Sequence, residues 1–472
     1  MTLRPAEEAR ASLEAAAPGT LSTAEPRHLE EPRGRWRAAS GLLARPRSTA
    51  EVAALVRTCA RERVGIVPLG GGTGLVGGQV AEGCLILSFE RMTAIREISR
   101  TEDLLICEAG AILSDVQAAA EAEGRLFPLS LASKGSARIG GLLAANAGGV
   151  NVLRWGNMRD LAVGVEAVLP DGTVLGGPGR LRKDNAGYDI RHLLIGAEGT
   201  LGIVTAASLR LVPPPASVAT AWIAVPSPEA ALKLLGIARD RAGEGVSAFE
   251  LISGVGLGFL AEHLPDLRQP LAPAPDWSVL IELGLPSAAE DALAGIYEAA
   301  AEAGLAGEAV LAASEAQRAA LWDVRESIPL GNRAVGALAS HDISVPLGMV
   351  PEMIAEGVRR LEGRGVRLNA FGHLGDGNLH YNLFPARGRA RGDYDAEALT
   401  GIVHGLVREL GGSIAAEHGV GRLKAAELAA TGDPGKLAAM RAVKAALDPA
   451  GIMNPGAVLP RRAEPPGRGR PA

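Results

Sequence analysis

Two histidines flank a short turn in "FGHLGDGNLHYNLF", the stretch of this sequence best suited to chemistry. Asp376-Gly377 between two apolar runs is a strong signal for a two-residue β-hairpin turn. With those residues as the turn, His373 faces His380 on one side of the hairpin, with Cβ atoms about 4.5–5.5 Å apart. Two imidazoles in this arrangement can share a metal ion.

Three further residues extend this pair. Asn382 lies on the same face of the hairpin as His380, because side chains alternate along a strand. Glu417 and His418 are neighbours in the glycine-flanked segment "AAEHGVGRLK". His373, His380 and Glu417 would form a set of two imidazoles and one carboxylate with open positions for a substrate, as catalytic metal sites require.

The other five histidines give weaker signals. A lone histidine is more often a hydrogen-bonded structural residue than a ligand. We take that interpretation for His28, His192, His263 and His404, and leave His341, in "SHDISVP", open.

A glycine-rich loop, "PLGGGTGLVGG" at residues 68–78, spells the G-x-G-x-x-G pattern of a Rossmann turn. A Rossmann turn opens a helix. Here a predicted strand at 64–69 precedes the glycines, the next strand begins near residue 84, and the glycines between make a poor helix. The sequence therefore predicts either a plain turn or a loop whose backbone N–H groups approach an anion such as a pyrophosphate.

Two more small-residue segments, "IGGLLAANAGG" (139–149) and "GAEGTLGIVT" (196–205), follow in the same region. Three such segments indicate one long ligand lying against backbone, and flavin adenine dinucleotide (FAD) has about that size.

The elements that must position these residues fall into two regions separated by "LVPPPAS" at 211–217. In the first, Ser48 and Glu51 predict the start of a capped helix, and Asp171-Gly172 predicts a hairpin over 163–175. Further predicted strands are 84–89, 104–110, 219–225 and 277–283, and further predicted helices are 228–241 and 287–304. Residues 461–472 are predicted to be a disordered tail.

Composition excludes several classes of protein. The 472 residues are 47% hydrophobic and 21% charged, which indicates a globular chain, and the net charge of −5 gives no basic footprint for nucleic acid. No apolar run is long enough to cross a bilayer, and we find no secretion signal. Cys59, Cys84 and Cys107 lack metal-type spacing and are predicted to be buried free thiols, so we expect a cytoplasmic protein.

The three small-residue segments, together with "KDNAGYDIRHLLIGAEGTLGIVT" and "GIMNPGAVL", resemble the FAD-linked oxidases of the vanillyl-alcohol oxidase / p-cresol methylhydroxylase (PCMH) superfamily. The resemblance is closest to the branch of D-2-hydroxyglutarate dehydrogenases, D-lactate dehydrogenases and glycolate oxidase flavoprotein subunits. It implies an α+β fold: a two-part PCMH-type FAD-binding domain at 1–215, an α+β substrate-binding domain with an antiparallel sheet at 216–410, and a C-terminal helical segment at 411–472 that returns to the flavin.

The resemblance also implies the flavin-binding residues. They are Pro68, Gly70, Gly71, Gly72, Thr73, Gly74, Gly78, Pro128, Ser130, Gly140, Gly141, Asn146, Ala147, Gly148, Glu198, Gly202, Ile203 and Asn454. Some members of the superfamily tether the flavin through a histidine in the first glycine loop. Residues 60–90 contain no histidine, so non-covalent FAD is expected.

The implied activity is FAD- and metal-dependent oxidation of a D-2-hydroxy acid. The resemblance assigns a metal, usually zinc, to His373, His380 and Glu417, and matches Arg325 to an arginine that pairs with the substrate carboxylate. His418 is our candidate base, and Asn382 is a further candidate to bind the carboxylate. The electron acceptor could be an electron-transferring flavoprotein, a quinone or oxygen, and a homodimer is common among such proteins.

Two departures leave the substrate open. Hydroxyglutarate dehydrogenases typically have a threonine where this chain has Pro329 and a lysine where it has Ser340. D-lactate or glycolate therefore competes with D-2-hydroxyglutarate as the substrate. Two other classes are alternatives: a non-catalytic flavoprotein subunit that passes electrons within a complex, and a zinc-stabilised nucleotide-binding module, which would be colourless.

Overall fold

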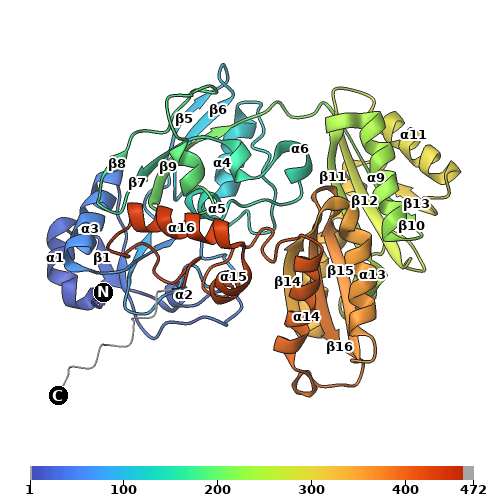
Figure 1. Cartoon of the computed structure of the whole chain (residues 1–472). Helices are drawn as coiled ribbons and strands as arrows, with labels where there is room; N and C mark the ends of the chain where they lie inside the picture. The colour runs from blue at the N-terminus through green and yellow to red at the C-terminus, as the bar shows by residue number, and fades with distance from the viewer. Residues whose placement is uncertain (1–2, 461–472) are drawn as a thin grey trace.

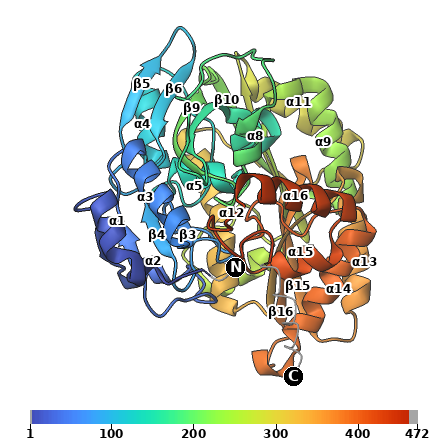
Figure 2. The ribbon, with the colours of Figure 1, turned by 60° about the vertical axis from the view of Figure 1, so that its left-hand side comes forward.

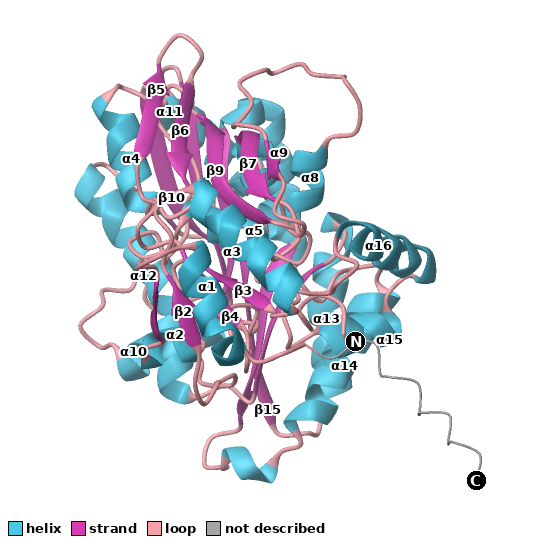
Figure 3. Ribbon diagram, turned by 90° about the vertical axis from the view of Figure 1, so that its left-hand side faces the viewer, coloured by secondary structure: helices cyan, strands magenta, loops and turns pink. Residues whose placement is uncertain are grey.

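The chain forms two lobes that are joined by its C-terminal segment (Figure 1). The computed structural model describes residues 3–460, so the predicted tail at 461–472 lies outside the described residues. The first lobe contains two sheets, and the second contains one large antiparallel sheet. Helices pack on the outer faces of the strands (Figure 3), which confirms the predicted α+β class.

The two sheets of the first lobe have different strand directions. The first sheet, in spatial order, comprises β1 (Leu21–Thr23), β2 (Leu42–Ala44), β4 (Leu85–Ser88) and β3 (Ile66–Leu69). The second comprises β5 (Ile95–Ser99), β6 (Leu104–Glu108), β9 (Ile203–Arg210), β7 (Ala162–Val168) and β8 (Val174–Leu175). Strand β4 runs parallel to β2 and β3, whereas every pairing in the second sheet is antiparallel.

Helices α1 to α8 accompany these sheets. They are α1 (Arg10–Ala16), α2 (Pro26–Leu29), α3 (Thr49–Glu62), α4 (Leu113–Ala122), α5 (Ile139–Ala145), α6 (Val152–Trp155), α7 (Met158–Leu161) and α8 (Ile190–Leu194). The predicted cap of α3 is present, because the Ser48 hydroxyl accepts the N–H of Glu51 at 3.2 Å. The chain passes from β3 to β4 without a helix, so the glycine loop is not a Rossmann turn.

The sheet of the second lobe has seven strands. In spatial order they are β13 (Ala309–Leu311), β10 (Ser217–Val225), β12 (Trp277–Leu285), β11 (Val246–Ser253), β15 (Val366–His373), β16 (Asn378–Pro385) and β14 (Ala339–Ser344). Its helices are α9 (Pro228–Ala242), α10 (Gly254–His263), α11 (Ala289–Glu302), α12 (Glu315–Val335), α13 (Val350–Leu361) and α14 (Ala396–Glu409). Helices α9, α11, α13 and α14 pack with the strands to form the main core of this lobe.

The predicted two-residue turn between the histidine strands is wrong. Residues Leu374–Asp376 form a 3₁₀ turn, and Gly377 follows in the left-handed region. The strands therefore pair two residues away from the expected register: His380 lies opposite Phe371, and His373 lies opposite Glu250 of β11. A slip of two residues keeps every side chain on its face, whereas a slip of one would reverse it, so both histidines still point to the same side.

The C-terminal segment carries α15 (Ala425–Thr431) and α16 (Pro434–Leu447) back to the first lobe. Figure 1 shows both helices in red in front of the first lobe, whereas α14 lies on the second lobe, and Figure 2 shows them from another side. The Lys444 ammonium donates to the Thr200 carbonyl at 2.7 Å, and Ile66 of β3 bridges Met453. One chain end thus fastens the second lobe to the first.

We expect Gly71→Ala to destabilise the first lobe. A Cβ at this position would lie 2.1 Å from the Ser136 carbonyl oxygen, so the glycine loop or its neighbour must move. Overpacking of this kind lowers the free energy of unfolding by about 1–3 kcal/mol, measurable by chemical denaturation. Gly176→Ala is the control, because its Cβ would meet no atom within 4 Å. Equal stability of the two variants would contradict the close approach.

Candidate active site

A cavity of about 1100 Å³ has walls from both lobes and from the C-terminal segment. Sixteen of the predicted flavin residues line it: Pro68, Gly70, Gly71, Gly72, Thr73, Gly74, Gly78, Ser130, Gly140, Gly141, Ala147, Gly148, Glu198, Gly202, Ile203 and Asn454. The predicted catalytic and metal residues are also in the wall: Arg325, His373, His380, Asn382, Glu417 and His418. The fold therefore gathers residues that lie some 380 positions apart in the chain.

Two predicted flavin residues, Pro128 and Asn146, are not in the cavity wall. The carbonyl of Pro128 accepts the side-chain amide of Asn151 at 2.9 Å. Asn146 ends α5 in the left-handed conformation, and its side chain accepts the N–H of Arg159 at 2.9 Å. Both shape the wall from behind rather than face the cavity.

The glycine loop suits a long anionic ligand because its backbone is accessible. Gly72 has φ +72°, and a Cβ there would meet nothing within 4 Å, so the chain at this point faces open space. Gly70 approaches Gly141 of α5 so closely that a Cβ would lie 3.2 Å from the Gly141 Cα. Two small-residue segments thus meet, and one wall of the cavity consists of their backbone groups. A wall of accessible backbone groups fits a dinucleotide.

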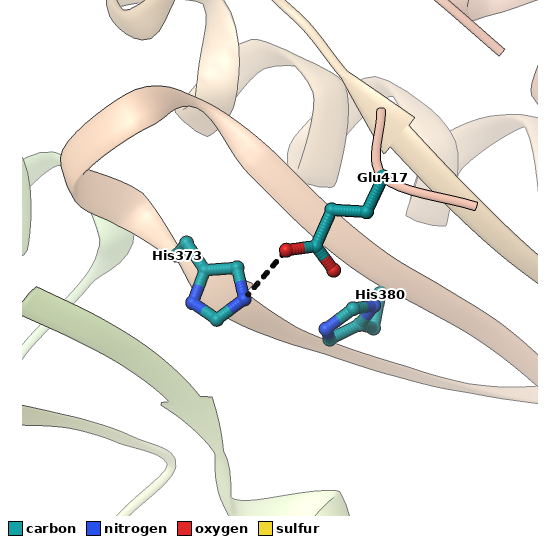
Figure 4. A group of neighbouring side chains, drawn as sticks. All are labelled: His373, His380 and Glu417. Carbon is teal, nitrogen blue, oxygen red and sulfur yellow. Dashed lines mark ion pairs between the residues drawn. The ribbon is translucent and has the colours of Figure 1, made fainter. Parts of the chain in front are cut away.

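His373, His380 and Glu417 converge at the other end of the cavity, where their ligand atoms all lie within 4.8 Å of one another (Figure 4). The Nε2 of His373 is 3.5 Å from Oε1 of Glu417. The two imidazole rings have centroids 5.6 Å apart. A pair of imidazoles and a carboxylate is a donor set that fits Zn²⁺ and related divalent ions.

Glu250 orients His373, one of these three residues, from the side away from Glu417. The sequence did not predict this role. The buried carboxylate of Glu250 accepts Nδ1–H of His373 at 2.6 Å, which leaves Nε2 to face Glu417. Burial opposes the charge on His373, but Glu250 outweighs it and raises the pKa of that imidazole to about 10. A carboxylate behind a histidine fixes the ring and its tautomer, as around metal-bound histidines.

Asp342 fixes the second group, and it was also missed. Its carboxylate, on β14, accepts the backbone N–H groups of Glu417 at 2.9 Å and His418 at 2.8 Å. Its other oxygen accepts the side-chain amide of Asn378 at 2.9 Å. Burial opposes this charge, but His418, His380 and the amide hydrogen bonds hold the pKa of Asp342 well below its ordinary range. Asp342 also lies near enough to Glu417 and His418 for ion binding, although these hydrogen bonds already occupy it.

His418 is placed to accept a proton. Its Nδ1 lies 3.4 Å from Asp342, and its ring stacks at 6.3 Å on that of His380. Burial is the main influence on its imidazole and lowers the pKa, while Asp342 and Glu417 oppose the change. The lowered pKa favours the neutral form of the imidazole, which is the form that a general base requires.

Arg325 is buried rather than exposed, and it contacts an acid. Its Nε donates to Glu250 at 2.7 Å, and its guanidinium lies 5.4 Å from the centre of the Phe371 ring. Arg325 is also one of the residues that line the cavity. The same Glu250 thus holds the predicted substrate anchor and the predicted metal ligand, His373, so the two are positioned together.

The two residues that depart from the hydroxyglutarate dehydrogenase pattern, Pro329 and Ser340, lie on different elements of the cavity wall. Pro329 lies inside α12 and Ser340 lies on β14 opposite Asn382, and both line the cavity. His341 also borders the cavity, but its Nδ1 bonds to the carbonyl of Tyr381 at 2.8 Å. Burial, chiefly, lowers the pKa of His341 to about 3. It is a hydrogen-bonded structural residue, as are His28 and His404.

Glu198 connects the flavin end of the cavity to the histidine end. Its carboxylate accepts the backbone N–H of Val420 at 2.7 Å and of Gly421 at 2.8 Å, just after His418. Its backbone carbonyl accepts the side-chain amide of Asn454 at 2.7 Å. The side chain of Glu198 therefore holds the C-terminal loop, and Glu198 also lines the cavity among the predicted flavin-binding residues.

Comparison with known proteins finds that two family models match the chain. Residues 41–176 match a family model described as an FAD binding domain, and residues 214–458 match one described as FAD linked oxidases, C-terminal domain. The chain belongs to the FAD-linked oxidases. The predicted family, the FAD cofactor and the oxidoreductase class are thereby confirmed.

The curated relatives include several proteins named D-2-hydroxyglutarate dehydrogenase. The mitochondrial protein of Bos taurus is 37% identical over 97% of this chain and 84% of its own length. That of Arabidopsis thaliana, also mitochondrial, is 36% identical over 90% of this chain and 76% of its own. The protein of Xanthomonas citri pv. viticola is 35% identical over 94% of this chain and 95% of its own.

Solved structures show the same fold at low identity. p-Cresol methylhydroxylase with bound substrate has a TM-score of 0.76 at 15% identity, and the match covers 98% of this chain and 100% of that one. An alkyldihydroxyacetonephosphate synthase has a TM-score of 0.71 at 18% identity, over 97% of this chain and 85% of that one.

Within residues 3–460 the structure has no helix whose length and apolar character would let it cross a membrane. Cys59, Cys84 and Cys107 are buried, as predicted. The expected cytoplasmic location stays a prediction, since the Bos taurus and Arabidopsis thaliana relatives are named as mitochondrial.

We expect Asp342→Asn to loosen the Glu417–His418 loop. Hydrogen bonds to a charged group contribute about 1.5–3 kcal/mol, so their loss should speed amide hydrogen exchange at these two residues about tenfold or more. Asp323→Asn, an exposed change on α12, is the control. Unchanged exchange at both amides in the Asp342 variant would show that the carboxylate does not hold the loop.

Proposed function

We propose that the protein oxidises a D-2-hydroxy acid to the 2-oxo acid at the cavity between its lobes. FAD supplies the hydride acceptor, and a divalent metal ion, zinc in our prediction, would polarise the substrate hydroxyl. The observation that carries the proposal is the convergence of His373, His380 and Glu417 in the wall of a cavity whose other end is the glycine loop. Gly148 joins the two ends, because a Cβ there would lie 3.4 Å from Oε1 of Glu417.

The side chains of the site divide the remaining tasks. His418 takes the hydroxyl proton, which its neutral imidazole and its position beside Glu417 support. Arg325 offers the donors of its guanidinium that do not bond to Glu250, and Asn382 offers its amide, for the substrate carboxylate. Glu250 and Asp342 act indirectly: they hold the ring of His373 and the backbone of Glu417 and His418 in place.

D-2-hydroxyglutarate is the leading substrate because the relatives described above are named D-2-hydroxyglutarate dehydrogenases. D-lactate is the second candidate, since Pro329 and Ser340 stand where two polar side chains are expected. The complete set of histidines and acids argues against a subunit that only passes electrons. The electron acceptor, the non-covalent attachment of FAD and a homodimer stay predictions.

Turnover of a panel of D- and L-2-hydroxy acids with a dye acceptor tests the proposal. We expect oxidation of D-isomers, with D-2-hydroxyglutarate first. Failure to oxidise any 2-hydroxy acid, with flavin and metal confirmed in the protein, would overturn it.

We expect His373→Ala and His380→Ala each to lower the metal content of the purified protein, measured by elemental analysis. Each variant removes one of three ligands, so turnover should fall with the metal. His192→Ala is the control, because that imidazole is 45% exposed and outside the cavity. Wild-type metal content in both ligand variants would place the metal elsewhere or exclude it.

For His418→Asn we expect kcat to fall about 10²–10⁴-fold, the contribution typical of a general base. Flavin absorbance and metal content should stay at wild-type levels, which separates lost proton transfer from a damaged site. A variant that keeps its kcat would show that another group takes the proton.

A further inference from the structure

Two arginines of the N-terminal region enter the substrate end of the cavity. Arg33 and Arg35 lie in the loop between α2 and β2, far in sequence from every other residue of the histidine site. Both line the cavity, together with Ser340, Asp342 and His418. No sequence motif marks them, because isolated arginines in an irregular loop form none.

The loop is held by its backbone, so its arginine side chains are free. The buried carboxylate of Glu31 accepts the N–H of Arg33 at 2.8 Å and the N–H of Arg35 at 2.5 Å. Gly34 between them has φ +67°, and Trp36 packs on Gly77 of the glycine loop. Within residues 3–460, neither guanidinium donates a hydrogen bond or forms an ion pair.

The charges of the two arginines act on residues of the histidine site. Asp342 attracts Arg33, whereas Arg33 disfavours a positive charge on His418 and Lys424, and Arg35 disfavours one on His341. These residues border β14, where Ser340 faces the cavity without a positive charge. A guanidinium without a partner in a cavity wall is a ready donor for a carboxylate, which it binds through two parallel hydrogen bonds.

We propose that Arg33 and Arg35 bind a second anionic group at the far end of the substrate, so that the enzyme selects dicarboxylic over monocarboxylic 2-hydroxy acids. The inference rests on the proposed function and decides between its two substrates. The metal set, Arg325 and Asn382 serve the carboxylate and hydroxyl that all 2-hydroxy acids share. The arginine pair serves only the end at which D-2-hydroxyglutarate and D-lactate differ. It would take the place of the threonine and lysine that hydroxyglutarate dehydrogenases typically have where this chain has Pro329 and Ser340.

The test compares Arg33→Gln, Arg35→Gln and the double variant with the wild-type holoenzyme. We expect kcat/KM for D-2-hydroxyglutarate to fall about tenfold or more in the double variant, mainly through KM, while that for D-lactate changes less than about threefold. Arg37→Gln is the matched control, since Arg37 lies in the same loop, is 70% exposed and is not in the cavity wall.

An equal loss of kcat/KM for both substrates would overturn the inference, because the arginines would then serve the flavin or the end that the two substrates share. No loss of kcat/KM for either substrate would also overturn it. A binding measurement separates this inference from the proposed function. Calorimetric titration with 2-oxoglutarate should show weaker binding to the double variant, and titration with pyruvate should show no change. If the wild type oxidises neither acid but the double variant still binds 2-oxoglutarate more weakly, the proposed activity fails and the anion site stands. If the wild type oxidises neither acid and the double variant binds 2-oxoglutarate equally well, both the proposed activity and the anion site fail.

Discussion

The arrangement of the site depends on two buried carboxylates, Glu250 and Asp342, which hold the predicted metal ligands and the predicted base in place. Asp342 is 3% exposed, and Glu250 is fully buried. A buried charge is unfavourable unless it is well hydrogen-bonded, so each acid strongly favours the one arrangement that satisfies it. For Glu250 that arrangement brings β11, β15 and α12 together, and for Asp342 it brings β14 and the C-terminal loop together.

These contacts explain how a site is assembled from distant parts of the chain. Glu417 and His418 belong to a loop between α14 and α15, and loops of this kind are ordinarily mobile. Here the loop is held on one side by Asp342 and on the other by Glu198 of the first lobe. The glycine-loop end and the histidine end of the cavity are thus joined through one short segment, which fixes the distance between them.

The fold and much of the site could be predicted from the sequence because their signals are local. The helix cap at Ser48, the β-branched strands and the glycine loop each depend on neighbouring residues. His373 and His380 came out on one face even though the predicted turn was wrong, since strand alternation survives a slip of two residues. Glu250, Asp342, Arg33 and Arg35 could not be found in this way. Their roles exist only after separate strands and loops meet, and nothing in their own neighbourhoods distinguishes them from ordinary surface or core charges.

The central claim is that this site passes a hydride from a D-2-hydroxy acid to flavin with the help of a metal ion at His373, His380 and Glu417. Anaerobic mixing of the FAD-loaded protein with D-2-hydroxyglutarate measures this in a single turnover, through loss of the oxidised flavin absorbance. The account predicts rapid loss in metal-loaded protein, little loss after the metal is removed, and recovery when zinc is restored. Equally fast reduction of the flavin in protein shown to be free of metal would contradict it.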